Sequence, residues 1–503
     1  MTDFSADAIL VAYYSILGIL ALFGSHRLFL LALYYRTRHL RPEQPADPET
    51  WPRVTVQLPI FNELYVAERL IRSVCNLDYP SDRLEIQVLD DSTDETRHRI
   101  ARLVDEYQQR GIQIEHLHRS DRTGFKAGAL ANGLEHSEGE LITVFDADFV
   151  PQEDYLRRVV PHFQDTQIGM VQACWGHLNS DYSLLTRIQS ILLDGHFLIE
   201  HAARQRSGRF FNFNGTAGTW RKQAVLDAGG WQHDTLTEDL DLSYRAQLAG
   251  WRFLYLQDLC VPAELPVEIN AFKRQQFRWA KGSIQTGRKL LRSILAAPIP
   301  WYVKLESLVH LTNNMSYVLM VGLSLLVFPA MMLRRGSSAK LILFVDLPLF
   351  ICATVSVLAF YGASQLVKSG SLKGHLRHLL PLMGLGIGLA VNNSRAVLEG
   401  FTKGVGVFER TPKYDIQSRA DRWRSKKYRA GANASLILEG LLASWFAATF
   451  VLAWQLGMWM SLPFLYLFLQ GYSYMVFLST LSLRGRHHSR KPLDRSPSTE
   501  RIS

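Results

Sequence analysis

The sequence has few cysteines, and their spacing gives them no recognisable chemical role. Its 503 residues contain four, namely Cys75, Cys174, Cys260 and Cys352, and no CxxC pair occurs among them. Disulfide frameworks and zinc sites both need closer or paired spacing, which is missing here. We therefore expect neither disulfides nor zinc and interpret the four residues as buried thiols.

The sequence also lacks an acidic excess. It carries 55 Lys and Arg against 46 Asp and Glu, a formal net charge of +9. The basic residues gather beside apolar segments instead of forming one patch interleaved with aromatics, which argues against nucleic acid as a partner. With 48% hydrophobic residues and a mean hydropathy of −0.01, the chain is unusually apolar for a soluble enzyme, so we expect part of it to lie in lipid.

No basic region precedes the first apolar stretch, residues 8–35, as it would in a cleaved signal peptide. Asp3 and Asp7 stand before this stretch, and four basic residues follow it: Arg36, Arg38, His39 and Arg41. A stretch of this length can cross a bilayer, and positive charge favours the inner side. The prediction is an integral membrane protein, of the inner or plasma membrane if bacterial, with its N-terminus outside and the next domain in the cytosol.

Four later apolar stretches, 305–333, 341–367, 436–457 and 462–483, are also long enough to cross. Residues 376–400 are ambiguous, but a crossing there would push the basic segment that follows it outside, contrary to the charge rule. We therefore place 376–400 along the inner interface and expect five crossings. The predicted division is a membrane helix (1–36), a catalytic domain (50–270), an interfacial helix (271–300), two membrane helices (301–370), an interfacial helix with a loop (371–434), two membrane helices (435–484) and a basic cytosolic tail (485–503).

The first half of the globular region alternates short β-rich runs with helical periodicity. The runs are 54–58, 85–89, 112–117 and 141–145, and the helical segments are 64–77, 94–109 and 126–135. This alternation predicts a parallel sheet with helices on both faces, which binds ligands beyond the carboxyl ends of its strands. Asp90, Asp91, Asp146 and Asp148 all fall at such ends.

Three polar constellations follow from this arrangement. The first is Asp146 and Asp148, a DxD pair after a buried strand, which would hold Mg²⁺ or Mn²⁺ through its oxygens. An isolated acidic triplet of this kind is commonly only a solvated turn or a helix cap. In this sequence a second acidic pair, at 90–91, follows another strand.

The second constellation is the sequence TED at 237–239, which precedes a helical pattern. A carboxylate there either caps the helix or takes a proton from an attacking hydroxyl. The third is QQFRW at 275–279, which places Gln275 and Arg278 on one helix face and Trp279 beside them. These side chains could bind a phosphate and stack on a sugar, but an amphipathic helix at the interface is an open alternative.

Seven pieces in order carry a resemblance to a known family. They are VQLPIFNE (56–63), VLDDSTD (88–94), GFKAGAL (124–130), FDADF (145–149), FNGTAGTWR (213–221), TED (237–239) and QQFRW (275–279). Together they resemble glycosyltransferase family 2, in particular the cellulose-synthase-like enzymes of the glucomannan and mannan synthase subgroup. The resemblance implies a GT-A (Rossmann-like) α/β domain attached to a helical membrane bundle.

The resemblance also implies roles for individual residues. Asp90 and Asp91 would hold the nucleoside, Lys126 would contact the diphosphate region, and Asp146 and Asp148 would serve the metal and the diphosphate. Asp239 would be the general base, with Glu238 near the acceptor. Gln275 and Arg278 would grip the pyrophosphate, and Trp279 would lie beneath the acceptor sugar.

The segment FERTPK at 408–413 resembles the FxVTxK gating loop of cellulose synthases, which folds over the bound nucleotide. This resemblance adds Thr411 and Lys413 to the residues expected at the donor. Arg410 stands where the loop of cellulose synthases has valine, so this position departs from the family pattern. A basic cytosolic loop without this function is the alternative.

The predicted activity is processive, inverting transfer from a sugar nucleotide to a growing β-linked polysaccharide, a mannan, glucan or glucomannan, that is moved across the bilayer. The donor stays open between GDP-mannose and UDP-glucose, and accessory export partners are compatible with the resemblance. Two alternatives remain: a single addition to a membrane lipid, and a membrane protein that binds a sugar nucleotide without catalysis.

Overall fold

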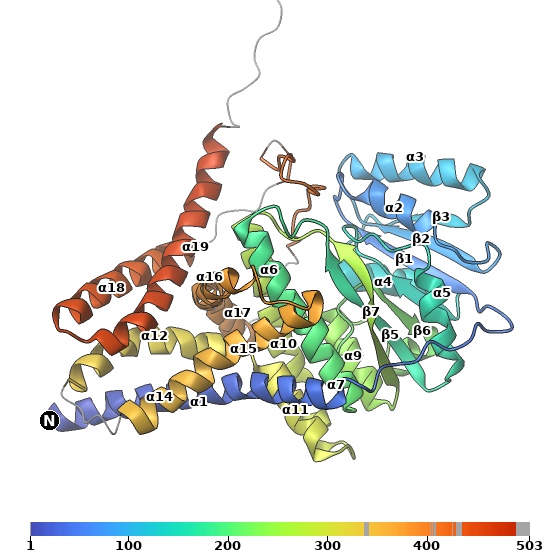
Figure 1. Cartoon of the computed structure of the whole chain (residues 1–503). Helices are drawn as coiled ribbons and strands as arrows, with labels where there is room; N and C mark the ends of the chain where they lie inside the picture. Colours follow the sequence, from blue (N-terminus) through green and yellow to red (C-terminus); the bar gives the residue numbers. More distant parts are fainter. Residues whose placement is uncertain are drawn as a thin grey trace, which may run out of the picture.

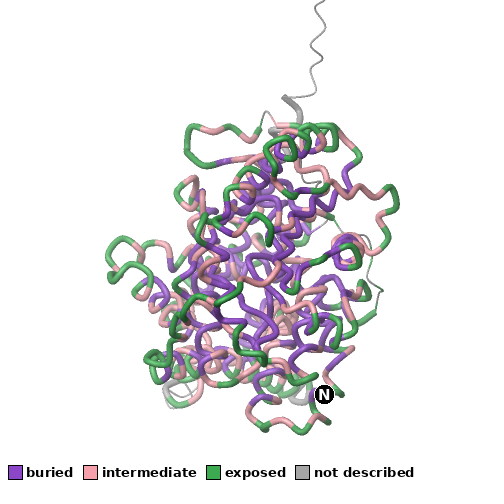
Figure 2. The backbone as a smooth tube through the Cα atoms, turned by 90° about the vertical axis from the view of Figure 1, so that its right-hand side faces the viewer, coloured by how far each residue is buried: buried purple, intermediate pink, exposed green. Residues whose placement is uncertain are grey.

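The computed structural model describes residues 2–335, 342–402, 404, 406, 409–424, 426–428 and 435–488. Figure 1 shows two regions, a sheet with its helices on one side and a bundle of long helices on the other. In Figure 2 the buried backbone runs through the middle of the molecule, and the exposed segments are mainly loops at its edge. The cavity described below is lined by residues of the sheet region and by residues of the segment 410–413, which lies between two bundle helices in sequence.

A seven-stranded sheet forms the centre of the catalytic region, in the order β3-β2-β1-β4-β6-β5-β7. Its first strands are β1 (Val54–Ile60), β2 (Leu84–Asp90), β3 (Ile114–His118) and β4 (Leu141–Val144), and they pair in parallel as predicted. The later strands are β5 (Ile168–His177), β6 (Gly218–Arg221) and β7 (Arg252–Ala263). Strand β6 runs antiparallel to β4 and β5, so the whole sheet is mixed.

Helices cover both faces of this sheet. Side chains alternate between the two faces along each strand, so each face presents apolar side chains for helices to cover. Val54, Val56 and Leu58 of β1 share one apolar cluster with α2 (Ala67–Cys75) and α3 (Thr96–Gln109). Leu89 of β2 lies in a second cluster with α4 (Phe125–His136). The three predicted helices are thus present with boundaries shifted by a few residues.

The remaining helices of this region lie around the sheet and are not confined to one of its edges. They include short segments, α5 (Tyr155–Val159), the 3-10 helix η1 (Val160–Gln164), α7 (Ala202–Arg206) and α8 (Lys222–Asp227), and longer ones, α6 (Leu184–Asp194), α9 (Glu238–Leu248) and α10 (Ile269–Ala296). A π-helix, η2 (Gly195–His201), joins α6 to α7. Helix α10 carries the QQFRW segment and contacts the membrane bundle.

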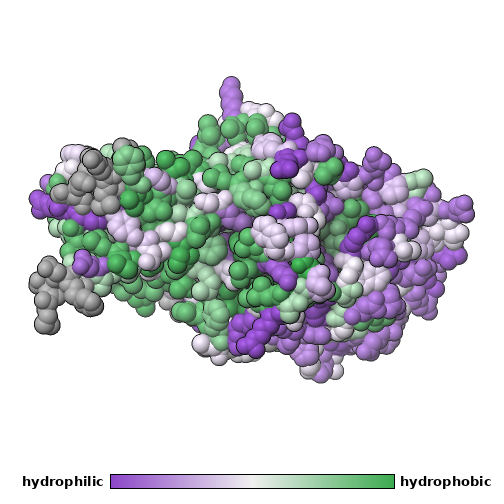
Figure 3. All heavy atoms as spheres, turned by 90° about the horizontal axis from the view of Figure 1, so that it is seen from below, coloured by the Kyte–Doolittle hydropathy of each residue, from purple (hydrophilic) through white to green (hydrophobic). Residues whose placement is uncertain are grey.

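In the part of the chain that the structure describes, five helical segments are long and apolar enough to cross a membrane: Ser5–Thr37, Met315–Leu333, Phe344–Ser369, Ser435–Gln455 and Trp459–Ser482. They correspond to the five predicted crossings, and the protein is a membrane protein. Figure 3 shows the apolar surface gathered on the side of these helices and the hydrophilic surface on the side of the sheet. The helices of the bundle are α1 (Thr2–Thr37), α12 (Met315–Leu333), α14 (Leu347–Phe350), α15 (Ser356–Ser369), α18 (Ser435–Gln455) and α19 (Leu462–His488). Two π-helical segments, η3 (Ile342–Asp346) and η4 (Ile351–Val355), lie before and after α14. A 3-10 turn, η5 (Trp459–Ser461), precedes α19.

Two predicted segments differ from the structure. The crossing predicted for 305–333 is wrong at its start, because α11 (Trp301–Thr312) ends before α12 begins, and Glu306 of α11 pairs with Arg204 of the catalytic region. Residues 376–400 form two helices, α16 (Leu376–Gly388) and α17 (Ala390–Thr402). Each is roughly 20 Å long, too short alone for a core of about 30 Å.

The tail predicted for 485–503 begins as a continuation of α19 to His488, and its remainder lies outside the described residues. The described part of the chain therefore ends, in sequence, on the last helix of the bundle. The boundaries of the predicted domains remain proposals.

Candidate active site

A cavity of about 200 Å³ lies at the carboxyl edge of the sheet, between β1, β4, α9 and α10. All the predicted site residues except Asp90 line it. Those that do are Asp91, Lys126, Asp146, Asp148, Glu238, Asp239, Gln275, Arg278, Trp279, Thr411 and Lys413. Residues spread over more than 300 positions of sequence thus meet in one place. The strand-end argument predicts this for the residues that follow the strands of the sheet, but it cannot predict it for those of α9, α10 and the segment 411–413.

The DxD carboxylates follow β4, where the chain leaves the sheet. The backbone N–H of Asp146 donates to the Thr216 hydroxyl at 2.8 Å, which fixes the turn. One carboxylate oxygen of Asp146 accepts from Lys126 Nζ at 2.6 Å, and one of Asp148 accepts from Lys413 Nζ at 2.6 Å. Burial raises the pKa of Asp146, while the charge of Lys126 lowers it. Each carboxylate therefore already has a cationic partner in the cavity.

Lys126 projects from the first turn of α4 toward the centre of the cavity. Its ammonium donates to the Gly215 carbonyl at 2.8 Å and lies 4.0 Å from Glu238. Burial lowers the pKa of Lys126, but Asp146 and Glu238 raise it above its ordinary value, so the side chain is charged. A lysine that would be read from sequence alone as a surface residue is thus a fixed cation at the site.

Asp239 lies in the first turn of α9, where the sequence predicts either a helix cap or a base that accepts a proton. Thr237 occupies the N-cap position, but its side chain makes no capping hydrogen bond, so a carboxylate of the first turn is left to accept the free N–H groups there. Asp239 Oδ1 accepts the N–H of Leu240 at 2.8 Å. Burial and then the neighbouring charge of Glu238 raise the pKa of Asp239 to about 7. A carboxylate with this pKa is well suited to accept a proton at neutral pH.

Gly215 is required beside Asp239 for steric reasons. It has a φ of +80°, and a Cβ added there would lie 2.9 Å from Asp239 Oδ2 and 3.3 Å from Lys126 Nζ. Any larger residue would strain the backbone and crowd the proposed base. The FNGTAG segment belongs to the family pattern, but the sequence alone indicates no role for Gly215.

The segment 409–413 closes one side of the cavity. Arg278 donates to the Glu409 carbonyl at 2.7 Å and to the Thr411 hydroxyl at 3.2 Å. Lys413 donates to Asp148 and to the Glu264 carbonyl. The structure therefore brings the loop-like motif to the DxD pair, although Phe408, the first residue of the motif, lies outside the described residues.

Arg410, which stands in the place of a valine, makes specific contacts. Its guanidinium pairs with Glu63 at 2.9 Å and lies over the ring of Tyr428, 3.9 Å from the centroid. Burial raises the pKa of Glu63 to about 7, and Arg410 opposes this shift. Neither Glu63 nor Tyr428 was predicted as a site residue, although Glu63 ends the first family motif and could have been found there.

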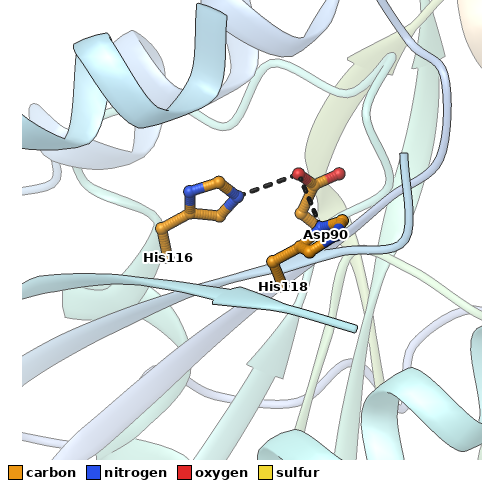
Figure 4. A group of neighbouring side chains, drawn as sticks. All are labelled: Asp90, His116 and His118. Atoms are coloured by element: carbon orange, nitrogen blue, oxygen red, sulfur yellow. Dashed lines mark hydrogen bonds and ion pairs between the residues drawn. The ribbon is translucent and has the colours of Figure 1, made fainter. Parts of the chain in front are cut away.

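Asp90 is the predicted residue that does not line the cavity. Its Oδ1 accepts the N–H of Ser92 at 2.8 Å, and its Oδ2 lies 2.8 Å from His116 Nε2 and 3.5 Å from His118 Nδ1 (Figure 4). Burial raises the pKa of Asp90, but these hydrogen bonds outweigh it and hold the pKa below its ordinary value. Asp90 thus positions histidines behind the cavity, and a contact with the nucleoside stays a prediction.

Asp91, the next residue, faces the cavity and is held by a two-pronged pair with Arg119. The two hydrogen bonds measure 2.9 and 2.6 Å. Beside it, Arg122 lies over the ring of Phe61, 3.3 Å from the centroid. Sequence reasoning missed Phe61, Arg119 and Arg122, because single arginines near a turn carry no distinctive pattern.

The fold and the site together define a class. A mixed sheet with a DxD pair after its central strand and a cavity at its carboxyl edge is the arrangement of a GT-A glycosyltransferase domain. A solved mannosyltransferase from Pyrobaculum calidifontis, in complex with GDP-Man and Mn2+, has a similar fold, with a TM-score of 0.51 and 21% identity over 77% of this chain and 99% of that chain.

The sequence comparisons identify the family of one part of the chain. Residues 52–282 match the family model described as glycosyltransferase like family 2 and are therefore a family 2 glycosyltransferase domain. Glucomannan 4-beta-mannosyltransferase 1 of Oryza sativa subsp. japonica is 45% identical over 258 residues, which is 50% of this chain and 50% of that protein. Glucomannan 4-beta-mannosyltransferase 2 of Arabidopsis thaliana is 44% identical over 266 residues, 52% of this chain and 50% of that protein. The matched region spans about half the length of these relatives.

Proposed function

We propose that this protein is a membrane-embedded, inverting hexosyltransferase that extends a β-linked polysaccharide from a sugar nucleotide and passes the product across the membrane. The observation that carries the proposal is Asp239, a carboxyl group with a pKa of about 7 in a cavity that also holds the DxD pair, the cations Lys126 and Arg278, and Trp279. The relatives with about 45% identity are named as β-mannosyltransferases, which supports transfer of a hexose with β linkage.

In the proposed reaction Asp239 takes the proton of the acceptor hydroxyl as its oxygen attacks the anomeric carbon of the donor. The bond from that carbon to the diphosphate breaks, and the nucleoside diphosphate leaves. Lys126 and Arg278 stabilise the charge that develops on the diphosphate, because both guanidinium and ammonium groups bind phosphate oxygens strongly. Trp279 would form the apolar floor on which the acceptor sugar stacks.

A divalent cation fits the carboxylates of this cavity. Asp146 and Asp148 offer oxygens at the strand end, and the buried Oε2 of Glu63 has no hydrogen-bond partner among the described residues. Oxygen ligands of this kind suit Mg²⁺ or Mn²⁺, and we propose that Asp146 and Asp148 hold the ion. When bound, the cation neutralises diphosphate charge.

The donor is proposed to be GDP-mannose. The relatives are named as mannosyltransferases, and the solved structure with a similar fold contains GDP-Man and Mn2+. Asp91, Gln275, Thr411 and Lys413 would contact this donor together with the residues above. UDP-glucose is the alternative donor.

The proposed orientation places the catalytic domain in the cytosol and the N-terminus outside. The first support is the basic cluster at the end of α1, which makes the two ends of this helix unequal in charge. The second is the set of five candidate crossings. Helices α16 and α17 would lie at the inner interface. Cysteine labelling from each side of sealed vesicles, at Ser5 and at an exposed catalytic-domain position, tests this orientation.

The activity is tested with the full chain in nanodiscs. Release of nucleoside diphosphate is measured with GDP-mannose, UDP-glucose, GDP-glucose and UDP-N-acetylglucosamine, each with Mg²⁺, with Mn²⁺ and with a chelator. We expect metal-dependent release with GDP-mannose and a ladder or insoluble β-linked polymer on sizing of radiolabelled product. A single glycolipid would show transfer without polymerisation, and no release with any donor would contradict the proposal.

A further inference from the structure

Two histidines that belong to none of the seven motifs lie directly behind the cavity. His196 and His201 are both on the π-helix η2, and their ring centroids are 4.2 Å apart. Hydrogen bonds of a π-helix join residues five apart, so side chains five apart lie near one another, which an α-helix does not allow. Such segments are rare and frequently occur at functional sites. The π-helix is therefore the feature that brings the two rings together.

Both rings bind the same side chain, Asn214, which lines the cavity. Asn214 Nδ2 lies 3.0 Å from His196 Nε2, and Asn214 Oδ1 lies 2.5 Å from His201 Nε2. The amide nitrogen can only donate and the amide oxygen can only accept. His196 therefore accepts at Nε2 and carries its proton on Nδ1, where it donates to Glu200 at 2.9 Å. The orientation of Asn214 is fixed from two sides.

Asn214 begins the loop that holds the chemical groups of the cavity. Its backbone N–H donates to Gln172 Oε1 at 3.0 Å. The next residue, Gly215, accepts from Lys126 and leaves no room for a Cβ against Asp239, and Thr216 accepts the N–H of Asp146. A displacement of Asn214 would therefore move the loop against the base, the lysine and the DxD turn together.

The polar chain continues from the histidines to the first membrane helix. Glu200 lies 3.6 Å from Arg204, Arg204 donates to Glu306 at 2.9 Å, and Glu306 lies 3.0 Å from His26 of α1. Although burial raises the pKa of Glu200, His196 and Arg204 lower it well below the ordinary value, so this carboxylate stays charged. Each link is a buried or half-buried hydrogen bond or ion pair, and together they connect α1 to the cavity.

We propose that His196 and His201 are positioning residues that orient Asn214 and so hold the 214–217 loop against Asp239 and Lys126. The inference rests on the proposed transferase function, which it deepens. Neither histidine lines the cavity, so neither touches the substrates. Glu200, Arg204 and Glu306 anchor the pair to α1, which makes the geometry of the site depend on the docking of a membrane helix.

A matched pair of substitutions at His196 separates its two hydrogen bonds. In His196→Gln the amide reaches the position of Nε2 and presents an oxygen that can accept from Asn214, but the bond to Glu200 is lost. In His196→Asn the shorter amide lies near Nδ1 and can donate to Glu200, but the bond to Asn214 is lost. We expect kcat to fall by about tenfold or more in His196→Asn and by much less in His196→Gln, because small displacements of catalytic groups are costly.

Both variants are compared with His162→Gln and His162→Asn, which change a buried histidine of η1 outside the cavity lining. The measurements are kcat per folded enzyme, the dissociation constant of the nucleoside diphosphate and the thermal midpoint. We expect unchanged nucleotide affinity, within about twofold, and kcat equal to wild type in the His162 pair. A purely structural role of His196 would lower the thermal midpoint in both variants and leave kcat per folded enzyme unchanged, and that result would overturn the proposal.

A double substitution provides the second test. Asn214→Ala should lower kcat at least as far as His196→Asn, and adding His196→Asn to it should cause no further loss, because the two act through one contact. Additive losses would contradict the assignment. The wild-type enzyme is assayed first: absence of turnover with every donor would refute the proposed function, whereas an active wild type with equally active histidine variants would refute only the positioning role.

Discussion

Two lysine–carboxylate pairs show how the membrane bundle and the cavity use charge differently. Where α10 packs against the bundle, Lys273 pairs with Glu439 of α18 at 2.7 Å, and both side chains are 0% exposed. In the cavity, Lys413 pairs with Asp148 at 2.6 Å, and the side chains are 10% and 11% exposed. The distances are nearly equal, but the surroundings differ.

The bundle pair is closed to any ligand. Lys273 also donates to Ser479 of α19 at 2.9 Å, and Glu439 accepts from Ser435 of its own helix at 2.7 Å, so the surrounding helices complete the hydrogen bonds of the pair. The cavity pair lines open volume, where a diphosphate could take Lys413 and a cation could take Asp148. A sealed pair holds helices together, whereas a pair facing a cavity can exchange its partners during a reaction.

The largest expected effect in the cavity comes from Asp239→Asn. Loss of a general base costs about 10²- to 10⁴-fold in rate, so kcat should fall by roughly 10³-fold while binding of nucleoside diphosphate is retained. Retained polymerisation by a pure, sequence-verified variant would refute the assignment of the base.

The same substitution should leave the fold intact or more stable. The pKa of Asp239 rises from 3.8 to about 7 on folding. A folded-state pKa above the unfolded value means that the protonated form is favoured by folding, so stability is lost as the pH rises through about 7. The neutral amide avoids this loss, and the thermal midpoint of Asp239→Asn at pH 8 should equal or exceed that of wild type.

In the bundle, Lys273→Met is expected to act in the opposite way. Removing one partner of a buried pair leaves an uncompensated charge and costs about 3–5 kcal/mol of stability. The thermal midpoint in detergent should fall strongly, whereas kcat of the remaining folded enzyme should change little. The control is Lys273→Met combined with Glu439→Gln, which removes the orphaned charge and should recover much of the loss. No recovery would mean that the pair is not the source of the effect.

The pH dependence of kcat gives the next largest effect. Because Asp239 must be ionised to accept a proton, the rate should be constant above a pH of about 7 and fall about tenfold for each pH unit below it. The measurement is initial release of nucleoside diphosphate from pH 5 to 9 at saturating donor. An acid limb centred near pH 4 would show that burial does not raise this pKa.

Two kinds of sequence signal predict parts of the site: the ends of the strands and the family motifs. Strand ends were found because alternating runs place them within a residue or two, and the motifs then supplied Lys126, Asp239 and Arg278. Asp90 was assigned to the cavity together with Asp91, but adjacent residues at a strand end point to opposite sides, and only Asp91 lines the cavity. The contacts of Asp90 with His116 and His118 depend on the pairing of β2 with β3.

Other features could not be predicted, because they depend on local geometry without a sequence signal. His196 and His201 are five apart, which fits no α-helical face, so only the π-helix reveals that they act on one side chain. The break between α11 and α12 falls at Asn313 and Asn314 within an otherwise apolar run, and a hydropathy window averages over it. Glu63, the ion-pair partner of Arg410, lies far away in sequence.

The smallest effect is expected from Lys413→Met, the cavity counterpart of Lys273→Met. Both side chains are mostly buried but line the cavity, so a cation or water there can compensate Asp148 once the ammonium is removed, and the thermal midpoint should fall less than in Lys273→Met. Without this cation the donor diphosphate loses one contact, and KM for the donor should rise about fivefold with a smaller change in kcat. The comparison is made by measuring KM and the thermal midpoint of both methionine variants side by side. If Lys413→Met destabilised the fold as much as Lys273→Met, the cavity pair would be a structural clamp and not an exchangeable contact.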